Sequence, residues 1–312
     1  MVKVNVGRNY FIGTFLLLCG IILTSLEQNA SGQSNLTVTS QEKDKSGNEK
    51  SESLHSVYSG LGFGNNMIYL GSNVSQDKPF LYTSVAYGYK NEFFASVSVH
   101  HLTAYDPLLS LTSFTLNYNR DLNSWFDISV GLSRYQVNKE LSETLFSSFF
   151  YGYLNLGFDW KILYTQLNAG GVFSEGSGAF FSLRNSRYIK TSDLAGGKAY
   201  FYFDPYFNLL FGNLTRTTTA DGTSTGVTPP FKPGGGSSSG GSGSGSGVTT
   251  STFFSLMELD LGLPAGFTFG KLTLEAEPGY IIPTFSDTGI TDPKGFTLFF
   301  NIFYKKHIHP QN

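Results

Sequence analysis

Large apolar side chains alternate with small or polar ones along most of this chain. In residues 81–89, for example, Leu81 and Tyr87 share one face, while Ser84 and Gly88 lie on the other. Successive side chains of a β-strand point to opposite faces, so a period of two predicts strands. The segments run for about 10 to 14 residues each, whereas strands of soluble proteins are usually about five or six residues long.

Strands of this length are long enough to cross a lipid bilayer. A tilted transmembrane strand needs about 9 to 11 residues, and because every backbone donor and acceptor in a bilayer must be paired, such strands close into a barrel. We therefore predict an all-β fold, a transmembrane antiparallel up-and-down β-barrel with apolar faces toward lipid and polar faces toward the lumen. About twelve strands fit the spacing best, although ten or fourteen also fit. The twelve segments are 57–71, 79–90, 92–104, 110–121, 124–137, 146–159, 161–173, 178–189, 198–212, 252–264, 270–284 and 295–305.

The composition favours this barrel over other classes of protein. Charged residues make up 14% of the chain, below the roughly 25% of soluble domains, and a soluble β-sandwich would expose charges on its outer faces. A helical membrane protein would need repeated apolar runs of about 20 residues, which this chain lacks. The net charge of −2 gives no reason to expect nucleic acid as a partner. Cys19 is the only cysteine, which excludes a disulfide framework.

The N-terminal part of the chain has the features of an export signal. Lys3 and Arg8 precede an apolar run at 15–23, and small residues at 30–32 suit cleavage. The stretch that follows is charged, rich in Ser and free of aromatic residues, which is typical of disorder. The predicted organisation is a cleaved signal peptide at 1–32, a disordered periplasmic lead at 33–54, an outer-membrane barrel at 55–306 and a short tail at 307–312.

Short and long connections alternate between the predicted strands. In outer-membrane barrels short turns face the periplasm and long loops face outward, so an even number of strands places both termini in the periplasm. The longest connection, 213–251, is rich in Thr, Pro, Gly and Ser and is predicted to be a flexible extracellular loop. It is either a lid over the mouth or a tolerated insertion, which costs little loop entropy. The short connections are predicted at 90–91, 121–123, 159–160 and 265–269.

Two features depart from this regular pattern. The connection 190–197 is longer than a periplasmic turn is expected to be. Proline removes a donor from the strand ladder, so bulges are expected where prolines fall in or beside the late strands. These prolines are Pro205, Pro264, Pro278 and Pro283.

Acidic residues gather on the inward-facing positions of three neighbouring strands. Carboxylates that lie close together in a narrow lumen repel one another and need cationic partners. Arg184 is the expected partner on the next strand, and Arg134 is a second candidate. The group is either an ion-paired network that fills the lumen, a cation-favouring constriction or ligand site, or a Ca²⁺ site with six or more oxygen ligands. Its members are Asp204, Glu258, Asp260, Glu275 and Glu277.

Motifs for catalysis or cofactor binding are not found in the sequence. There is no His/Cys metal spacing, phosphate-binding loop or nucleophile elbow, so no cofactor is predicted. Gly60, Gly62 and Gly64 alternate in one strand, where they relieve crowding on the lumen face. His101 and Thr103 share a face near the outer rim, which is similar to barrel enzymes that act on lipids. A working site also needs a nucleophile and an orienting partner, so the chain is predicted not to be an enzyme.

Several segments together resemble uncharacterised outer-membrane β-barrels of Bacteroidota. They are the Gly-Leu-Gly-Phe-Gly strand at 60–64 and the segments at 87–94, 203–207 and 277–283. This resemblance covers most of the chain after the signal, and it implies an outer-membrane barrel. It brings no activity, ligand or catalytic residue with it.

Two classes of function fit these observations. A polar lumen with an acidic patch favours a narrow channel for small solutes. A lumen filled with Tyr side chains favours a non-conducting barrel with a structural or surface-interaction role. A lipid hydrolase at the rim is a remote third. The predicted partners are outer-membrane lipid and, for the channel, small solutes.

Overall fold

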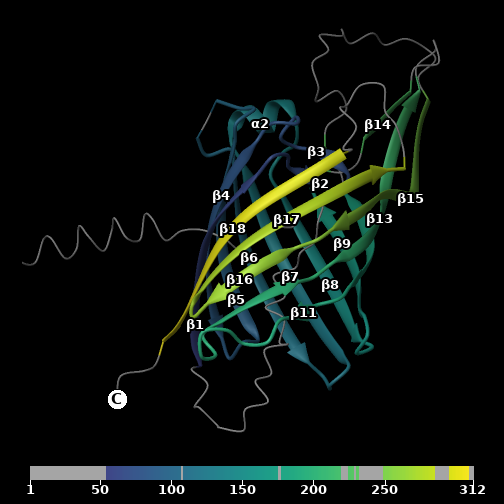
Figure 1. Ribbon diagram of the computed structural model, residues 1–312. Coiled ribbons are helices and arrows are strands. Elements are labelled where there is room, and N and C mark those ends of the chain that lie inside the picture. The colour runs from purple at the N-terminus through teal and green to yellow at the C-terminus, as the bar shows by residue number, and fades with distance from the viewer. Residues whose placement is uncertain are drawn as a thin grey trace, which may run out of the picture.

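The chain folds as a closed β-barrel, seen in the computed structural model (Figure 1). The first strand of the barrel pairs with the last, and all neighbouring strands are antiparallel, which confirms the predicted fold class. The structure describes residues 54–106, 108–174, 177–218, 224–227, 230–231, 249–284 and 295–308. The twelve barrel strands are β1 (His55–Gly64), β4 (Phe80–Tyr89), β5 (Phe93–Leu102), β6 (Leu111–Asp121), β7 (Phe126–Val137), β8 (Phe149–Asp159), β9 (Tyr164–Phe173), β10 (Gly178–Ser186), β13 (Tyr206–Thr218), β15 (Thr249–Gly262), β17 (Leu272–Pro283) and β18 (Gly295–Ile308).

Three short strands continue the barrel wall toward the end that holds the termini. Strand β11 (Ile189–Lys190) pairs with β12 (Ala199–Phe203), β12 pairs with β16 (Ala265–Phe269), and β16 pairs with β17. Pro205 separates β12 from β13, and Pro264 separates β15 from β16. Proline cannot donate to the ladder, and the strands break at these two residues where bulges were expected. At Pro278 and Pro283 the pairing continues without a register shift, so the bulges predicted there are wrong.

The predicted short connection at 265–269 is wrong, because these residues form β16. The turn lies at Gly270 and Lys271, where Gly270 has a left-handed φ of 58°. The alternation of Ala265 to Phe269 continues the pattern of β15, and Leu263 and Pro264 interrupt the hairpin without ending it. The connection 190–197 is likewise shortened by strand pairing, since Leu194 forms a bridge with Ala199.

Both described ends of the chain lie at the end of the barrel that carries the tight turns (Figure 1). Lys90 and Asn91 form such a turn, with left-handed φ values of 56° and 54°, as a two-residue hairpin turn requires. Strand β18 reaches Ile308, so the first two residues of the predicted tail belong to the barrel. The predicted signal peptide at 1–32, all but Leu54 of the lead and residues 309–312 lie outside the described residues.

The outward-facing side chains form an apolar belt around the barrel. Leu116 is 64% exposed and Val130 and Leu132 are each 48% exposed, although all three lie within strands. Exposed aromatic side chains gather toward both rims, as in the interfacial girdles of membrane barrels. They are Phe93, Trp125, Trp160, Phe269 and Tyr304 toward the end with the termini, and Phe63, Phe150, Phe173, Tyr280 and Phe296 toward the other. None of the helices in the described part of the chain is long and apolar enough to span a membrane.

Residues 65–79, which we call the plug, fold into the end of the barrel opposite the termini. The prediction of a single strand at 57–71 is wrong here, because the barrel strand ends at Gly64. Strands β2 (Ile68–Tyr69) and β3 (Ser72–Asn73) form a small hairpin of their own. Leu70 and Gly71 supply the left-handed φ values, 48° and 78°, that its two-residue turn requires.

Side-chain hydrogen bonds hold the plug in its hairpin form. The carboxylate of Asp77 accepts from the amides of Asn66 and Asn73, at 2.9 and 2.7 Å. The hydroxyl of Ser75 accepts from the backbone N–H of Met67 at 2.7 Å and donates to the side-chain carbonyl of Asn66. The side chains of Asn66, Asn73, Ser75 and Asp77 therefore bind one another or the plug backbone, which leaves the apolar side chains of the plug to pack against the barrel wall.

The plug reaches across the mouth of the barrel. It emerges between β1 and β4, yet the ring of Tyr69 lies 5.4 Å from that of Tyr135 on β7 and 5.9 Å from that of Phe149 on β8. On another side, a Cβ atom at Gly71 would lie 2.4 Å from the methyl group of Met257 on β15. These walls lie on different parts of the barrel, so the plug fills the space between them.

Helix α2 (Lys139–Thr144) covers the same end of the barrel. Asn138 caps it by accepting from the N–H of Leu141 at 2.9 Å. Leu141 and Phe146 are buried, and the ring of Phe146 packs edge-on against Phe231 at 5.2 Å. Both phenylalanines belong to the apolar cluster that also contains the plug residues Met67, Tyr69, Leu70 and Val74.

The predicted extracellular loop at 213–251 is shorter than expected. Strand β13 continues to Thr218, β15 begins at Thr249, and β14 (Ser224–Val227) pairs with β13. Threonine is β-branched and favours strands, and the hydroxyls of Thr215 and Thr252 lie 3.0 Å apart across the hairpin. The Gly/Ser tract at 234–247 lies outside the described residues.

Candidate functional site

Tyrosine side chains cross glycines to reach carboxylates inside the lumen. Tyr202 on β12 lies opposite Gly266 on β16, which in turn lies opposite Glu275 on β17. The Tyr202 hydroxyl donates to the Glu275 carboxylate. A Cβ atom on Gly266 would sit 2.2 Å from the Tyr202 ring, so only glycine permits this crossing.

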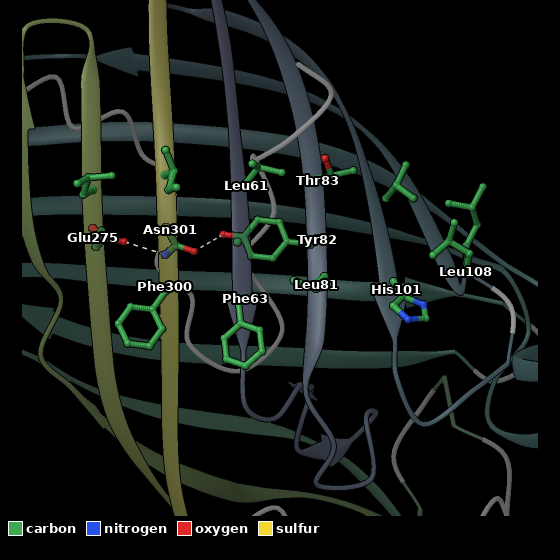
Figure 2. A pocket seen from close by; sticks show the side chains of 15 residues that line it. Leu61, Phe63, Leu81, Tyr82, Thr83, His101, Leu108, Glu275, Phe300 and Asn301 are labelled. Carbon is green, nitrogen blue, oxygen red and sulfur yellow. Dashed lines mark hydrogen bonds between the residues drawn. The ribbon is translucent and has the colours of Figure 1, made fainter. Parts of the chain in front are cut away.

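The same row of residues continues across the seam where the first and last strands meet. The amide of Asn301 on β18 donates to Glu275 at 3.1 Å, and the hydroxyl of Tyr82 on β4 donates to the Asn301 carbonyl at 2.6 Å (Figure 2). Between them Tyr82 passes over Gly62 on β1. One hydrogen-bonded row thus ties together the strands on both sides of the seam, and His100 on β5 extends it by stacking on Tyr82 at 5.7 Å.

Two further tyrosines cross a glycine on a neighbouring strand to reach a carboxylate. Tyr206 crosses Gly262 and donates to Glu277 at 2.8 Å. Near the end with the termini, Tyr164 crosses Gly157 and donates to both oxygens of Asp127, at 3.1 and 3.0 Å. Gly157 and Gly262 therefore play the same part as Gly62 and Gly266, because each of the four makes room for a tyrosine from a neighbouring strand.

Replacing Gly62 by valine should lower the free energy of unfolding by about 1–3 kcal/mol, the usual cost of overpacking. A Cβ atom at this position would lie 1.9 Å from the Tyr82 ring, so the ring must leave and the row must open at the seam. Urea titration of the barrel in lipid vesicles, followed by Trp fluorescence, measures the loss.

Gly171 is the matched control, since its Cβ atom would meet only ordinary contacts, the nearest at 3.5 Å. Gly171→Val should change stability by less than about 0.5 kcal/mol. Adding Tyr82→Ala to Gly62→Val should recover part of the loss by removing the clash. Equal losses at the two glycines would mean that strand propensity, and not the crossing, explains the effect.

The five predicted carboxylates all lie on the lumen side. Glu258, Asp260 and Glu277 are completely or almost completely buried, with exposed fractions of 0%, 1% and 2%. Glu275 and Asp204 are half-buried. Neutral groups are hydrogen-bond partners of four of them: Tyr202 and Asn301 for Glu275, Tyr206 for Glu277, Asn208 for Asp260 at 2.9 Å, and Ser186 for Asp204.

Acceptor oxygens outnumber donors in this cluster. Among the described residues, both carboxylate oxygens of Glu258 and one oxygen each of Asp204, Asp260, Glu277 and Asn208 are buried without a hydrogen-bond partner. Buried polar atoms are usually paired, so this part of the lumen departs from the norm. The described residues contain no group of three or more His, Cys, Asp or Glu side chains that could hold a metal ion.

A β-bulge places Met257 beside Glu258 on the lumen side. The register shifts between Leu210 and Phe211, so that Leu210 faces Glu258 and Phe211 faces Leu256. Strict alternation with the inward-facing Glu258 would place Met257 on the lipid-facing side, and the bulge reverses this orientation. Met257 is fully buried and packs against the turn of the plug, which brings the plug and the acidic cluster together.

Arg184 on β10 is the cation that joins the acidic cluster. It is 7% exposed, and it lies opposite Asn208, which lies opposite Asp260. Its guanidinium sits 3.6 Å from the centre of the Tyr206 ring. The charge is close enough to act on Asp204, Asp260, Glu275 and Glu277.

The prediction that Arg134 reaches into the lumen is wrong. It alternates with Ser133 and Tyr135, which are buried on the lumen side, and its guanidinium lies 4.5 Å from the centre of the ring of Phe150, which is 42% exposed. Period two therefore puts Arg134 on the outer face, near the rim with the long loops. A long arginine side chain reaches the interface from such a position.

His100 and His101 point to opposite sides of the wall. His100 is buried in the lumen, whereas His101 is half-buried on the outer face. The hydroxyl of Thr103, which shares a face with His101 in the sequence pattern, donates to the carbonyl of Pro79 at 2.6 Å. The Thr103 hydroxyl therefore donates to the main chain and not to His101.

No protein-family model matches the chain, and no curated protein is similar to it in sequence. Among solved structures, a NanC porin shares 9% identity at a TM-score of 0.42, over 79% of this chain and 98% of that one. LpxR from Salmonella typhimurium shares 7% at 0.41, over 80% and 99%. The beta domain of the Bordetella autotransporter Brka shares 12% at 0.30, over 80% and 98%. At such low values these likenesses carry no argument about function, and the barrel rests on its own strand pairing.

Proposed function

We propose that the protein is an integral outer-membrane β-barrel that is closed to solutes and serves as a structural or surface-interaction protein. The apolar belt and the two aromatic girdles support the membrane location. Export through the predicted signal peptide at 1–32, and the kinship with Bacteroidota barrels, are parts of the same proposal. Short turns and both described ends on one side support a periplasmic orientation of that side.

The plug is the main observation that supports a barrel closed to solutes. Its apolar side chains are buried against β7, β8 and β15, and Phe146 and Phe231 complete the same cluster. Below it, the rows of Tyr, Asn and Glu side chains reach across the lumen face of several strands. A side-chain-filled interior of this kind is typical of small barrels, whereas porins leave an aqueous channel.

A narrow cation channel is the second candidate, and the acidic cluster favours it. Carboxylate rings select cations in known pores, and Glu258 and Asp260 hold buried acceptor atoms without partners among the described residues. Such a channel requires the plug to leave the mouth.

The purified protein should show no stepwise conductance in planar bilayers. Insertion is checked separately by flotation with vesicles and by the shift in gel mobility on heating. Stable conductance steps from the inserted wild-type barrel would contradict the closed barrel and favour the channel.

A further inference from the structure

The outer face of the barrel has a groove of about 730 Å³. It crosses strands β17, β18, β1, β4 and β5 and is open to the surroundings (Figure 2). This volume falls in the range of roughly 300–1,000 Å³ typical of sites that hold a drug-sized ligand. A barrel wall is convex, so a groove of this size needs a local cause.

Side-chain size along the strands explains the groove. Thr83 on β4 and Val99 on β5, directly opposite each other, are small. Larger side chains surround them, among them Phe300 and Leu81, which are 49% and 50% exposed. Leu108, from the loop after β5, is 71% exposed and forms one end of the groove.

The lining of the groove is apolar except toward one end, where it becomes polar. His101 lies opposite Leu81, near the rim with the long loops. The N–H and hydroxyl of Thr103 both donate to the carbonyl of Pro79, at 3.2 and 2.6 Å. These bonds hold the exposed Lys78 at the rim just above Leu81 and His101. Its neighbour Asp77 is bound to the amides of the plug, whereas the side chain of Lys78 is exposed and has no such contact to the plug in the hydrogen bonds described above.

We propose that this groove binds one phospholipid with an anionic head group. The inference rests on the proposed membrane location. An acyl chain lies along the groove between Thr83 and Val99, and the phosphate meets Lys78 at the rim. Two observations favour a lipid: the groove is part of the apolar outer face of the barrel, and an exposed lysine stands at its membrane-surface end, where an anionic head group would be.

Native mass spectrometry of the barrel extracted from vesicles of phosphatidylglycerol and phosphatidylcholine tests the site. The wild type should retain one phosphatidylglycerol molecule per barrel. Thr83→Trp fills the groove and should lower the retained fraction about tenfold, which corresponds to about 1.4 kcal/mol. Val130→Trp, on the outer face of β7 and 48% exposed, is the control and should retain lipid as the wild type does.

A second variant tests the head group separately. Lys78→Gln should keep lipid binding but abolish the preference for phosphatidylglycerol over phosphatidylcholine. Undiminished retention by Thr83→Trp would overturn the proposal. A wild-type dimer that Thr83→Trp dissociates would also overturn it, because the occupant would then be a second copy of the chain. Failure of the wild type to float with vesicles would instead contradict the membrane location.

Discussion

Replacing Arg184 by methionine should lower the free energy of unfolding by about 3–5 kcal/mol, the cost of removing one partner from a buried set of charges. Arg184 is 7% exposed, and Asp260 and Glu277 nearby are buried more deeply still. Methionine fills a similar volume without charge, so the loss measures electrostatics rather than a cavity. Part of this loss of stability comes from the contact between the Arg184 guanidinium and the Tyr206 ring, whose centre lies 3.6 Å away. Urea titration in vesicles, followed by the fluorescence of Trp125 and Trp160, gives the value.

Arg134→Met is the matched control on the outer face. Its guanidinium packs on the exposed ring of Phe150 near the rim, so the loss should stay below about 1 kcal/mol. Adding Glu277→Gln to Arg184→Met should recover stability, since one buried charge is removed with its partner. If Arg184→Met and Arg134→Met cost the same, the acidic cluster does not depend on Arg184.

Alternation alone predicts most of the barrel wall. In β7, Val130 and Leu132 face outward while Ser129 and Ser133 are buried, as period two requires. The pattern works because each side chain of a membrane barrel faces either lipid or lumen, and the two environments select different residues. Element boundaries depend instead on turns, which is why β16 was mistaken for a connection.

The plug was not predicted, because its apolar side chains repeat at the same period of two as those of a barrel strand. Met67 and Tyr69 repeat at the strand period, and the sequence contains no Asn-Gly or Asp-Gly turn between them and Ser72. The turn uses Leu70 in a left-handed conformation, with φ 48°, which is rare for such a residue. Only the packing against Tyr135 and other distant side chains reveals that the chain folds inward.

The side of the wall that a candidate residue faces is predictable where strict alternation holds. It is not predictable where a bulge shifts the strand register. Glu275 and Glu277 face inward as period two places them, because no bulge separates them from their strand neighbours. Met257 could not be placed, because its orientation depends on a bulge opposite Leu210. The crossing tyrosines were also missed, although inward Gly and Tyr residues on neighbouring strands, such as Gly266 and Tyr202, are a readable signal once the register is known.

Removing the plug should open the barrel. Replacing residues 66–78 by Asn-Gly leaves a short turn between Gly64 and Phe80, which are already paired. The variant should fold, because the wall and the seam row from Glu275 to Tyr82 do not involve the plug. Stepwise conductance in planar bilayers should then appear where the wild type shows none.

Deletion of residues 234–247, a segment of similar length, is the control and should leave the barrel closed. In the opened barrel the lumen carboxylates should favour cations, because charged side chains that line a pore determine its selectivity. Glu258→Gln combined with Glu275→Gln should therefore reduce the cation preference measured by reversal potential in a salt gradient. A plug-free barrel that shifts in gel mobility on heating but does not conduct would mean that the tyrosine rows, and not the plug, close the lumen.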